Sequence, residues 1–256
     1  MSDVHLDVEQ HLAGLEAAAD RLAGWATEAG PDAAVPTCPG WSVADLVAHQ
    51  GRVHRWALAA LSGADLRTVG IDDQEGPDGD AVEWLRAGAT ELLDVLRTAP
   101  DDLVAPTFLR EAPPARLFWA RRQHHETAVH ALDALAAREG RMPSAADAWF
   151  GADVARDGID ELLVGFWPRR GRGPRSEDGA YPAVVATAEG DRWWLEVGPD
   201  SVRTRLLGRH EPDPAPDAVR LSGPALEVHL ALWNRGGAPA DPDGLLDRWR
   251  TGGAVG

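Results

Sequence analysis

The hydrophobic and polar residues in the first part of the chain follow a helical pattern. Apolar side chains recur at intervals of three and four residues, which places them on one face of an α-helix. Glycine and proline interrupt the pattern at positions where helices commonly end. Helices are predicted over residues 4–29, from Ser42 onward, over residues 81–98 and over residues 114–138. We therefore expect a four-helix bundle over residues 1–142.

The pattern changes near residue 143, where strand-like alternation follows one further helix. Residues 151–166 keep a helical period, after which apolar and polar residues alternate as in half-buried strands. Strands are predicted over residues 181–187, 192–197, 202–207 and 218–221, and a last helix ends within residues 230–236. The first three strands indicate an antiparallel meander. We therefore expect a small α+β domain with an antiparallel sheet over residues 143–256.

The predicted second helix carries a histidine on its apolar face. Ser42 is a favourable N-cap residue, and Asp45 stands where it can complete a capping box. The apolar stripe of this helix contains, besides His49, the residues Leu46, Val53, Trp56 and Ala60. We therefore expect His49 to point into the bundle, whereas His54 lies well around the helix.

Four polar residues of the predicted fourth helix share one narrow sector, because positions three and four apart stack over one another. They are Arg122, Glu126, His130 and Asp133. Trp119 and Ala137 fall in the same sector, so this face should point inward. A carboxylate and an imidazole buried there without partners would cost several kcal/mol. A metal ion and a hydrogen-bonded network are the two candidates that would compensate them.

Glu126 and His130 have the i, i+4 spacing that lets two helix side chains converge on one ion. An inward-facing His49 from the second helix would complete a set of two histidines and one carboxylate. Three protein ligands leave positions open, which is the pattern of catalytic rather than structural zinc. The alternative is a hydrogen-bonded buried pair with a separate core histidine. Asp133 would either accept a hydrogen bond from a ligand histidine or be exposed.

The neighbouring His124 and His125 do not fit this ligand set. His125 and His130 are five residues apart, so they diverge by about 140° on a helix with 3.6 residues per turn. The zincin pattern H-E-x-x-H is therefore absent. We expect His124 at the surface and His125 at the flank of the bundle.

Composition excludes several classes of function. The net charge of −16 disfavours nucleic-acid and anionic-membrane partners, and the one local basic cluster, residues 169–175, is interpreted as a loop. No stretch approaches the roughly 20 apolar residues of a membrane span. Since the N-terminus has neither a basic start nor an apolar run, we expect no signal peptide and a cytoplasmic protein.

Cys38 is the single cysteine, so an internal disulfide is impossible and a reducing compartment is indicated. It stands shortly before the second helix, a position where a thiol can act as a nucleophile. Its place beside Pro39 and Gly40 favours the alternative of a compact buried residue that fixes the loop.

Three stretches of the sequence match a known pattern. They are Cys38-Pro-Gly-Trp-Ser-Val-Ala-Asp-Leu-Val-Ala-His49 followed by Val53-His-Arg-Trp56, then Trp119-Ala-Arg-Arg-Gln-His-His-Glu-Thr-Ala-Val-His-Ala-Leu-Asp133, and more loosely Leu221-Ser-Gly-Pro-Ala-Leu-Glu-Val-His-Leu-Ala-Leu-Trp-Asn-Arg235. The chain thereby resembles the mycothiol-dependent maleylpyruvate isomerase family of the DinB-like superfamily. The resemblance implies a DinB-like four-helix bundle followed by a small, sterol-carrier-like α+β domain. All 25 basic residues are Arg, which agrees with the GC-rich genome of an actinobacterial source.

The resemblance further implies a metal and a cosubstrate. His49, Glu126 and His130 would hold a divalent ion, usually Zn²⁺, and mycothiol, a small thiol of actinobacteria, would be the cosubstrate. Coordination to Zn²⁺ stabilises a thiolate, which is the nucleophilic form. Arg235 would contact an anionic part of the thiol or of the substrate through its planar guanidinium, or else cap a helix end at the surface.

The expected function is that of a zinc-dependent, mycothiol-using transferase or isomerase that acts on a small electrophilic substrate. One alternative is a metal-dependent hydrolase with bound water as the nucleophile. Another is a noncatalytic binding or regulatory protein that the ion stabilises. We expect a small thiol and a small electrophile as partners, no nucleic acid or membrane, and a monomer.

Overall fold

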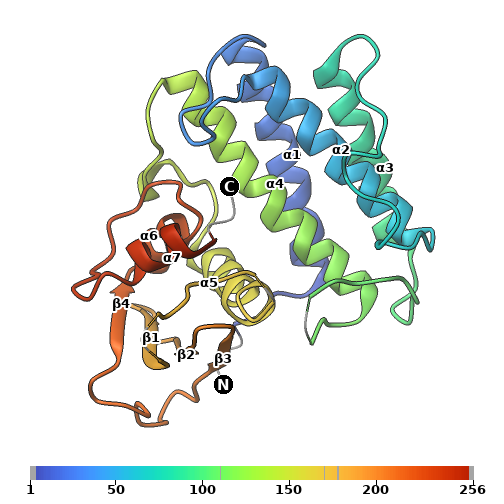
Figure 1. Ribbon diagram of the computed structural model, residues 1–256. Helices are drawn as coiled ribbons and strands as arrows, with labels where there is room; N and C mark the ends of the chain where they lie inside the picture. Colours follow the sequence, from blue (N-terminus) through green and yellow to red (C-terminus); the bar gives the residue numbers. More distant parts are fainter. Residues whose placement is uncertain (1–3, 110, 170, 178, 254–256) are drawn as a thin grey trace. The chain divides into compact units, whose positions relative to one another are not determined.

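The computed structural model describes residues 4–109, 111–169, 171–177 and 179–253. The chain forms two compact units, one with the long helices and one with the sheet (Figure 1). The helical unit comprises Asp7–Phe108 and Ala112–Pro143, and the sheet unit takes in the chain from Ser144 together with residues 4–6, Leu109 and Glu111. Arg170, part of the predicted basic loop, lies outside the described residues.

Four helices make up the helical unit, as the sequence predicts. They are α1 (Val8–Ala29), α2 (Val43–Leu61), α3 (Ala81–Thr98) and α4 (Ala115–Glu139). Helix α1 packs along α4 and also against α3, while α2 packs against α3 and α4 (Figure 1). Their apolar faces meet in a leucine-rich core, in which Leu15, Leu46, Leu85 and Leu132 are fully buried.

Helix α1 begins four residues later than the apolar pattern predicts. The Asp7 side chain accepts a hydrogen bond from the Gln10 amide and forms a capping box, so the helix starts at Val8. The preceding Leu6 amide instead donates to Asp157 Oδ2 at 2.9 Å within the sheet unit. The first apolar residues therefore belong to a different core from the helix that follows them.

The ends of α2 and α4 are fixed by the residues that the sequence singles out. In the capping box of α2, the Asp45 amide donates to Ser42 Oγ at 3.2 Å and the Ser42 amide donates to Asp45 Oδ2 at 2.9 Å. Helix α4 follows Pro114 and ends at Gly140, which has a left-handed backbone with φ of 64°. These two helices carry the candidate site.

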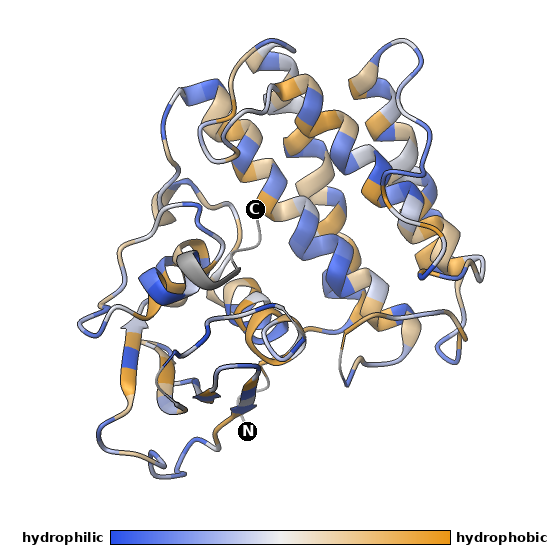
Figure 2. Ribbon diagram, viewed as in Figure 1, coloured by the Kyte–Doolittle hydropathy of each residue, from blue (hydrophilic) through white to orange (hydrophobic). Residues whose placement is uncertain are grey.

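Helix α4 is buried on nearly all sides although its first half is hydrophilic. Figure 2 shows the hydrophilic run along this helix, and Arg122, Gln123, His124 and His125 within it are each no more than 2% exposed. Polar groups at such depth require hydrogen-bond or ionic partners. The partners of these residues therefore define what the bundle can do.

The sheet unit contains four strands in the order β3-β2-β1-β4. The strands are β1 (Tyr181–Thr187), β2 (Arg192–Val197), β3 (Val202–Leu206) and β4 (Val219–Gly223). The first three form the predicted antiparallel meander, in which Trp194 of β2 lies opposite both Val184 and Arg205. Strand β4 instead pairs parallel to β1, so the sheet is mixed rather than wholly antiparallel. The long connection over residues 207–218 permits this, because a parallel pair needs a crossover.

Helices and a tryptophan-rich core complete the sheet unit. The helices are α5 (Ala152–Asp160), which continues as the π-helical segment η2 (Glu161–Phe166), then α6 (Ala225–Leu232) and α7 (Leu245–Gly253), with a short 3-10 turn η1 (Ala145–Asp147) before them. Trp167, Trp193 and Trp249 are fully buried in this unit. Within the described ranges, no helix is both long enough and apolar enough to cross a membrane.

Candidate functional site

The helical unit brings the three predicted ligand residues together. Nε2 of His130 lies 3.4 Å from Oε1 of Glu126, and Nε2 of His49 lies 3.9 Å from the same oxygen. One donor atom from each of the three residues falls within 4.8 Å of the other two. Residues far apart in the chain therefore point their donor atoms at one shared space between α2 and α4.

This cluster has a buried side and an accessible side. The His130 side chain is only 6% exposed, whereas 29% of the His49 side chain and 25% of the Glu126 side chain are exposed. The cluster therefore lies at the margin of the bundle, with His130 on its buried side. The apolar stripe predicts that His49 points into the core, whereas in the structure it lies at the edge of the core.

Arg122 holds the second oxygen of the Glu126 carboxylate. Nη2 of Arg122 donates to Oε2 of Glu126 at 2.5 Å, one helical turn away, and Arg122 is itself buried. Burial raises the pKa of Glu126, but the charge of Arg122 and the hydrogen bonds from His130 and His49 outweigh it and hold this pKa well below its usual value. Glu126 is thus a carboxylate at neutral pH, with Oε1 facing the two histidines.

Asp133 fixes the orientation of the His130 ring from behind. Nδ1 of His130 donates to Oδ2 of Asp133 at 2.9 Å, and Asp133 is fully buried. Burial lowers the pKa of His130, but the hydrogen bonds to Asp133 and Glu126 outweigh burial and raise this pKa to about 9. Of the two alternatives for Asp133, the geometry matches the hydrogen-bonding one.

Cys38 lies behind the same carboxylate. Its Sγ donates to Oδ2 of Asp133 at 3.4 Å, and the residue is 7% exposed. Cys38, Asp133 and His130 also lie close enough together to form a second group of potential metal donors. Because Asp133 uses one oxygen for both the thiol and the imidazole, we interpret Cys38 as a buried support of this carboxylate.

Trp41 is a residue of the site that the sequence reasoning missed. Its ring lies 5.0 Å from the His49 ring and 6.3 Å from the His130 ring, almost parallel to the latter at 17°. A tight turn aims it there, since the Trp41 amide donates to the Cys38 carbonyl and Gly40 has φ of 89°. The Pro-Gly-Trp sequence before the helix could have predicted this turn, since proline and glycine favour tight turns.

Helix α2 buries the predicted Leu46, Val53 and Ala60, but its buried face is wider than the apolar stripe. His54, expected well around the helix, is fully buried and contacts Gln50 and Thr127 through hydrogen bonds. The prediction for His54 is therefore wrong. It failed because the buried face was drawn only as wide as the apolar stripe, whereas Gln50 and His54 beside that stripe are buried by pairing with each other.

The predictions for His124 and His125 are also wrong, since both rings are buried. Their planes stack at 14°, and Nδ1 of His124 lies 3.1 Å from Nδ1 of His11 on α1. Gly14 makes room for this contact, because a Cβ at that position would lie 2.2 Å from Nε2 of His124. Helix α1 packs closely along α4 and covers the face of α4 that was expected to be exposed.

Arg235 lies in the sheet unit, directly after α6. It is 2% exposed, and its Nη1 donates to the Trp233 carbonyl at 2.8 Å. The neighbouring Asn234 adopts a left-handed backbone with φ of 58°. The surface position offered as an alternative is therefore wrong, and a contact with an anionic ligand stays a prediction.

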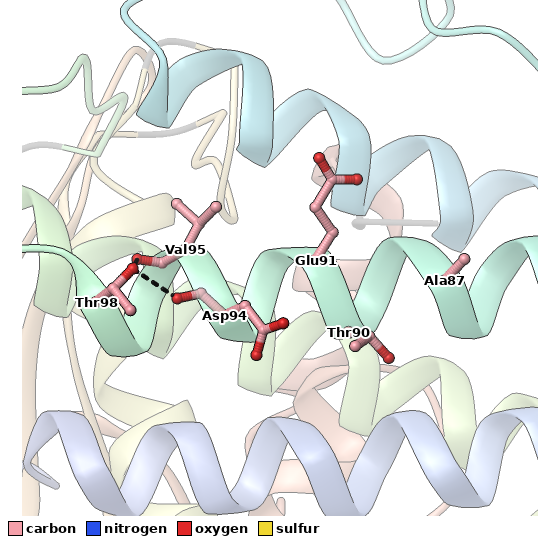
Figure 3. Close-up of a pocket in the computed structure, with 6 residues that line it drawn as sticks. All are labelled: Ala87, Thr90, Glu91, Asp94, Val95 and Thr98. Carbon is pink, nitrogen blue, oxygen red and sulfur yellow. Dashed lines mark hydrogen bonds between the residues drawn. The ribbon is translucent and has the colours of Figure 1, made fainter.

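Two hollows of the helical unit are lined by none of the residues of this cluster. One, of about 600 Å³, lies on the outer face of α3, where Figure 3 shows the Glu91 and Asp94 carboxylates pointing to different sides of the helix. The other, of about 620 Å³, lies between the end of α1 and the starts of α2 and α3. Neither is lined by a histidine or a cysteine, so the cluster at His130 is the stronger candidate site.

Comparison with solved structures identifies the class of fold. The chain resembles the crystal structure of an alanine mutant of the mycothiol-dependent maleylpyruvate isomerase, with 14% identity, a TM-score of 0.59, and coverage of 92% of this chain and 93% of that one. It also resembles the crystal structure of the mycothiol-dependent maleylpyruvate isomerase itself, with 15% identity, a TM-score of 0.54, and coverage of 93% and 94%. At these identities the likeness establishes a shared fold, a helical bundle followed by an α+β unit.

Sequence comparison then identifies the family. The mycothiol maleylpyruvate isomerase N-terminal domain matches residues 12–135, and the C-terminal domain of the same family matches residues 153–254. The chain therefore belongs to the mycothiol maleylpyruvate isomerase family. No curated protein matches it.

Proposed function

We propose that this protein is a zinc-dependent, mycothiol-using isomerase or S-transferase that acts on a small electrophilic substrate. Family membership supports the reaction class, and the relatives of known structure are named for their dependence on mycothiol. The convergence of His49, Glu126 and His130 is the observation that carries the proposal. A cytoplasmic location and a monomeric state are part of the same proposal.

The spacing of the donor atoms fits a divalent ion. Two ligands that each lie about 2.0–2.1 Å from a tetrahedral ion are about 3.3–3.5 Å apart. The separation between His130 and Glu126 is 3.4 Å and that between His49 and Glu126 is 3.9 Å, so a small movement of His49 completes the set. Two histidines and one carboxylate leave a position open for an incoming ligand.

When bound, the ion supplies positive charge that favours the thiolate form of an incoming thiol. The chain's own residues prepare the place for it. Asp133 accepts a hydrogen bond from Nδ1 of His130, which keeps the proton on Nδ1. When the ring is neutral, the lone pair of Nε2 is therefore directed at the cluster. Arg122 pairs with one oxygen of Glu126 and leaves the other facing the histidines.

In the proposed reaction, the thiolate sulfur of mycothiol forms a bond to an electrophilic carbon of the second substrate. The displaced electron pair of the carbon–carbon double bond moves onto the conjugated carbonyl. In an isomerisation the molecule rotates about the former double bond, which is now a single bond. The electron pair then returns from the carbonyl, the double bond forms again and the sulfur leaves as thiolate. In a transferase reaction the carbon–sulfur bond is retained, and the enolate takes a proton from water at the carbon next to its carbonyl. Arg235 would pair with an anionic group of either reactant.

Metal content tests the ligand assignment. The purified protein is expected to hold one equivalent of zinc by elemental analysis, and His49→Ala and His130→Ala are each expected to hold much less. The matched control is His210→Ala, since His210 is exposed in the sheet unit and outside the ligand set. Retention of one equivalent of zinc by His130→Ala would contradict the assignment of His130 as a ligand.

Dependence on mycothiol separates the candidate functions. Maleylpyruvate is the first electrophile to test, and turnover should require both zinc and mycothiol. A metal-dependent hydrolase would act equally well without mycothiol, and a noncatalytic protein would show no turnover with any electrophile.

A further inference from the structure

A second polar cluster lies in the interior of the bundle between α2 and α4. Nε2 of Gln50 lies 2.9 Å from Nε2 of His54, and both nitrogens lie 3.0 Å from Oγ1 of Thr127. All three residues are fully buried. They form a closed triangle that links two helices and has no assigned role in the proposed reaction.

Gln123 adds a fourth polar side chain to this interior. It lies one helical turn before Thr127 on α4 and is fully buried. Trp119, one turn earlier still, contacts Trp56 of α2 with ring centres 5.3 Å apart. Gln123 therefore stands between two residues that both contact α2, which places it on the side of α4 that carries the triangle.

Four buried polar atoms of this cluster have no hydrogen-bond partner among the residues that the structure describes. They are Oε1 of Gln50, Nδ1 of His54, and both Nε2 and Oε1 of Gln123. Buried polar groups are rarely left unpaired, because each one loses its hydration without compensation. Two such atoms on the triangle and two on Gln123, one helical turn from Thr127 along α4, point to a ligand that pairs with them.

The unpaired atoms comprise both donors and acceptors. The Gln50 amide nitrogen can only donate, so Nε2 of His54 accepts and the proton of the neutral ring resides on Nδ1. His54 Nδ1 and the Gln123 amide nitrogen then offer hydrogen, and the two glutamine oxygens accept it. Water, which donates twice and accepts twice, matches this set and commonly makes two to four bonds in such sites.

The charge of the cluster excludes an ion as its ligand. Burial, followed by the charge of Arg55, lowers the pKa of His54 to about 3, so this ring is neutral at neutral pH. The two glutamines and Thr127 carry no charge. An ion held by these four groups would be buried without a counter-charge.

We propose that Gln50, His54, Gln123 and Thr127 form an internal hydration site that holds ordered water between α2 and α4. The bridge joins the helices at residues that directly follow His49 and Glu126 in the sequence. The site thus ties together the two helices that carry the candidate ligands. The hydration site does not depend on a metal being bound.

Relaxation dispersion of water nuclei tests the proposal, because it counts internal water with long residence times. The wild-type protein is expected to show such water, and Gln123→Leu should lose at least one molecule and unfold at a lower temperature. The matched control is Gln74→Leu, the same change at a half-buried residue that pairs with Gly70 outside the cluster, which should keep the wild-type count.

Two results would overturn the proposal. The first is an unchanged count in Gln123→Leu together with a higher unfolding temperature, since removing unpaired groups from a dry core stabilises it. The second is a crystal structure of the wild-type protein that shows no water density near the four atoms, or shows an ion there. This second measurement applies even if the variant fails to fold.

Discussion

At the level of single residues, the two nitrogens of the His130 ring have different tasks. Nδ1 donates to the buried Asp133, and Nε2 faces Glu126 at 3.4 Å. Asp133 in turn also accepts from Cys38. The carboxylate behind the ring therefore sets both its orientation and its affinity for protons, and we expect the same control over a metal ion.

Replacing Asp133 tests this control. Above pH 9, where the His130 ring is neutral, Asp133→Asn should weaken zinc binding by about 10- to 100-fold in competition with a chelator, because the ring loses its charged partner. At neutral pH the His130 ring must release a proton before it binds zinc. The variant ring releases this proton more readily, so the loss of zinc affinity should be smaller than above pH 9. Asp94→Asn, on the outer face of α3, is the control and should bind zinc as the wild type does. Equal affinity of all three proteins above pH 9 would contradict the role of Asp133.

At the level of elements, α2 presents two polar surfaces to α4. His49 lies at the accessible edge near Glu126, and His54 lies in the interior with Gln50 and Thr127. The two histidines differ in environment because they are five residues apart on one helix, which separates them by about 140°. Helix α2 thus supplies both a candidate ligand, His49, and a buried histidine, His54, that hydrogen-bonds to α4.

Because His54 is buried as a neutral ring, the stability of the fold depends on pH. The pKa of His54 is about 3 in the folded protein and about 6.5 for an ordinary histidine, so the unfolded chain binds the extra proton between these values. The stabilisation is complete above pH 6.5 and is lost as the pH falls toward 3, at up to about 1.4 kcal/mol per pH unit from this group. Chemical denaturation of wild type and His54→Gln across this range should show a shallower slope in the variant, with the exposed His210→Gln as the control. Parallel slopes in all three would contradict the assignment.

The element positions were largely predictable, whereas the burial of polar residues was not. Apolar periodicity, the capping box at Ser42 and Gly140 located the bundle helices closely. The same periodicity misplaced His54, His124 and His125, because it identifies one inward face per helix, whereas α2 and α4 are buried on more than one face. It also had no means of showing that β4 pairs parallel to β1, which depends on the path of residues 207–218.

The closeness of Glu126 and His130 was predictable because their spacing on one helix is local, whereas the addition of His49 depended on the apolar stripe of another helix and on the family resemblance. Glu126 and His130 are one turn apart, and His49 follows a recognisable helix start. Trp41 and Arg122 were not assigned, since their roles depend on which side chains the folded helices bring near them. The contact of Trp41 with two histidine rings arises from a turn and not from any periodicity.

At the level of the whole molecule, the candidate ligands and Arg235 belong to different compact units. Every donor atom of the proposed ion site comes from the helical unit, which agrees with a metal-binding bundle followed by a second domain. The division into domains at residues 1–142 and 143–256 stays a prediction. It implies that metal binding and turnover can be separated by cutting the chain.

A fragment of residues 1–142 tests this separation. It should fold into helices, bind zinc with an affinity within about tenfold of the whole chain, and show no turnover because Arg235 is missing. The same fragment with His130→Ala is the control and should fold but not bind. A helical fragment that takes up no zinc would contradict the location of the site.

The central claim is that His49, Glu126 and His130 hold a zinc ion with a position open to a thiol. Zinc X-ray absorption of the loaded protein, before and after addition of mycothiol, tests it most directly. We expect only nitrogen and oxygen neighbours at first and one sulfur at about 2.3 Å once mycothiol is present. A zinc environment that contains sulfur before mycothiol is added, or gains none afterwards, would contradict it.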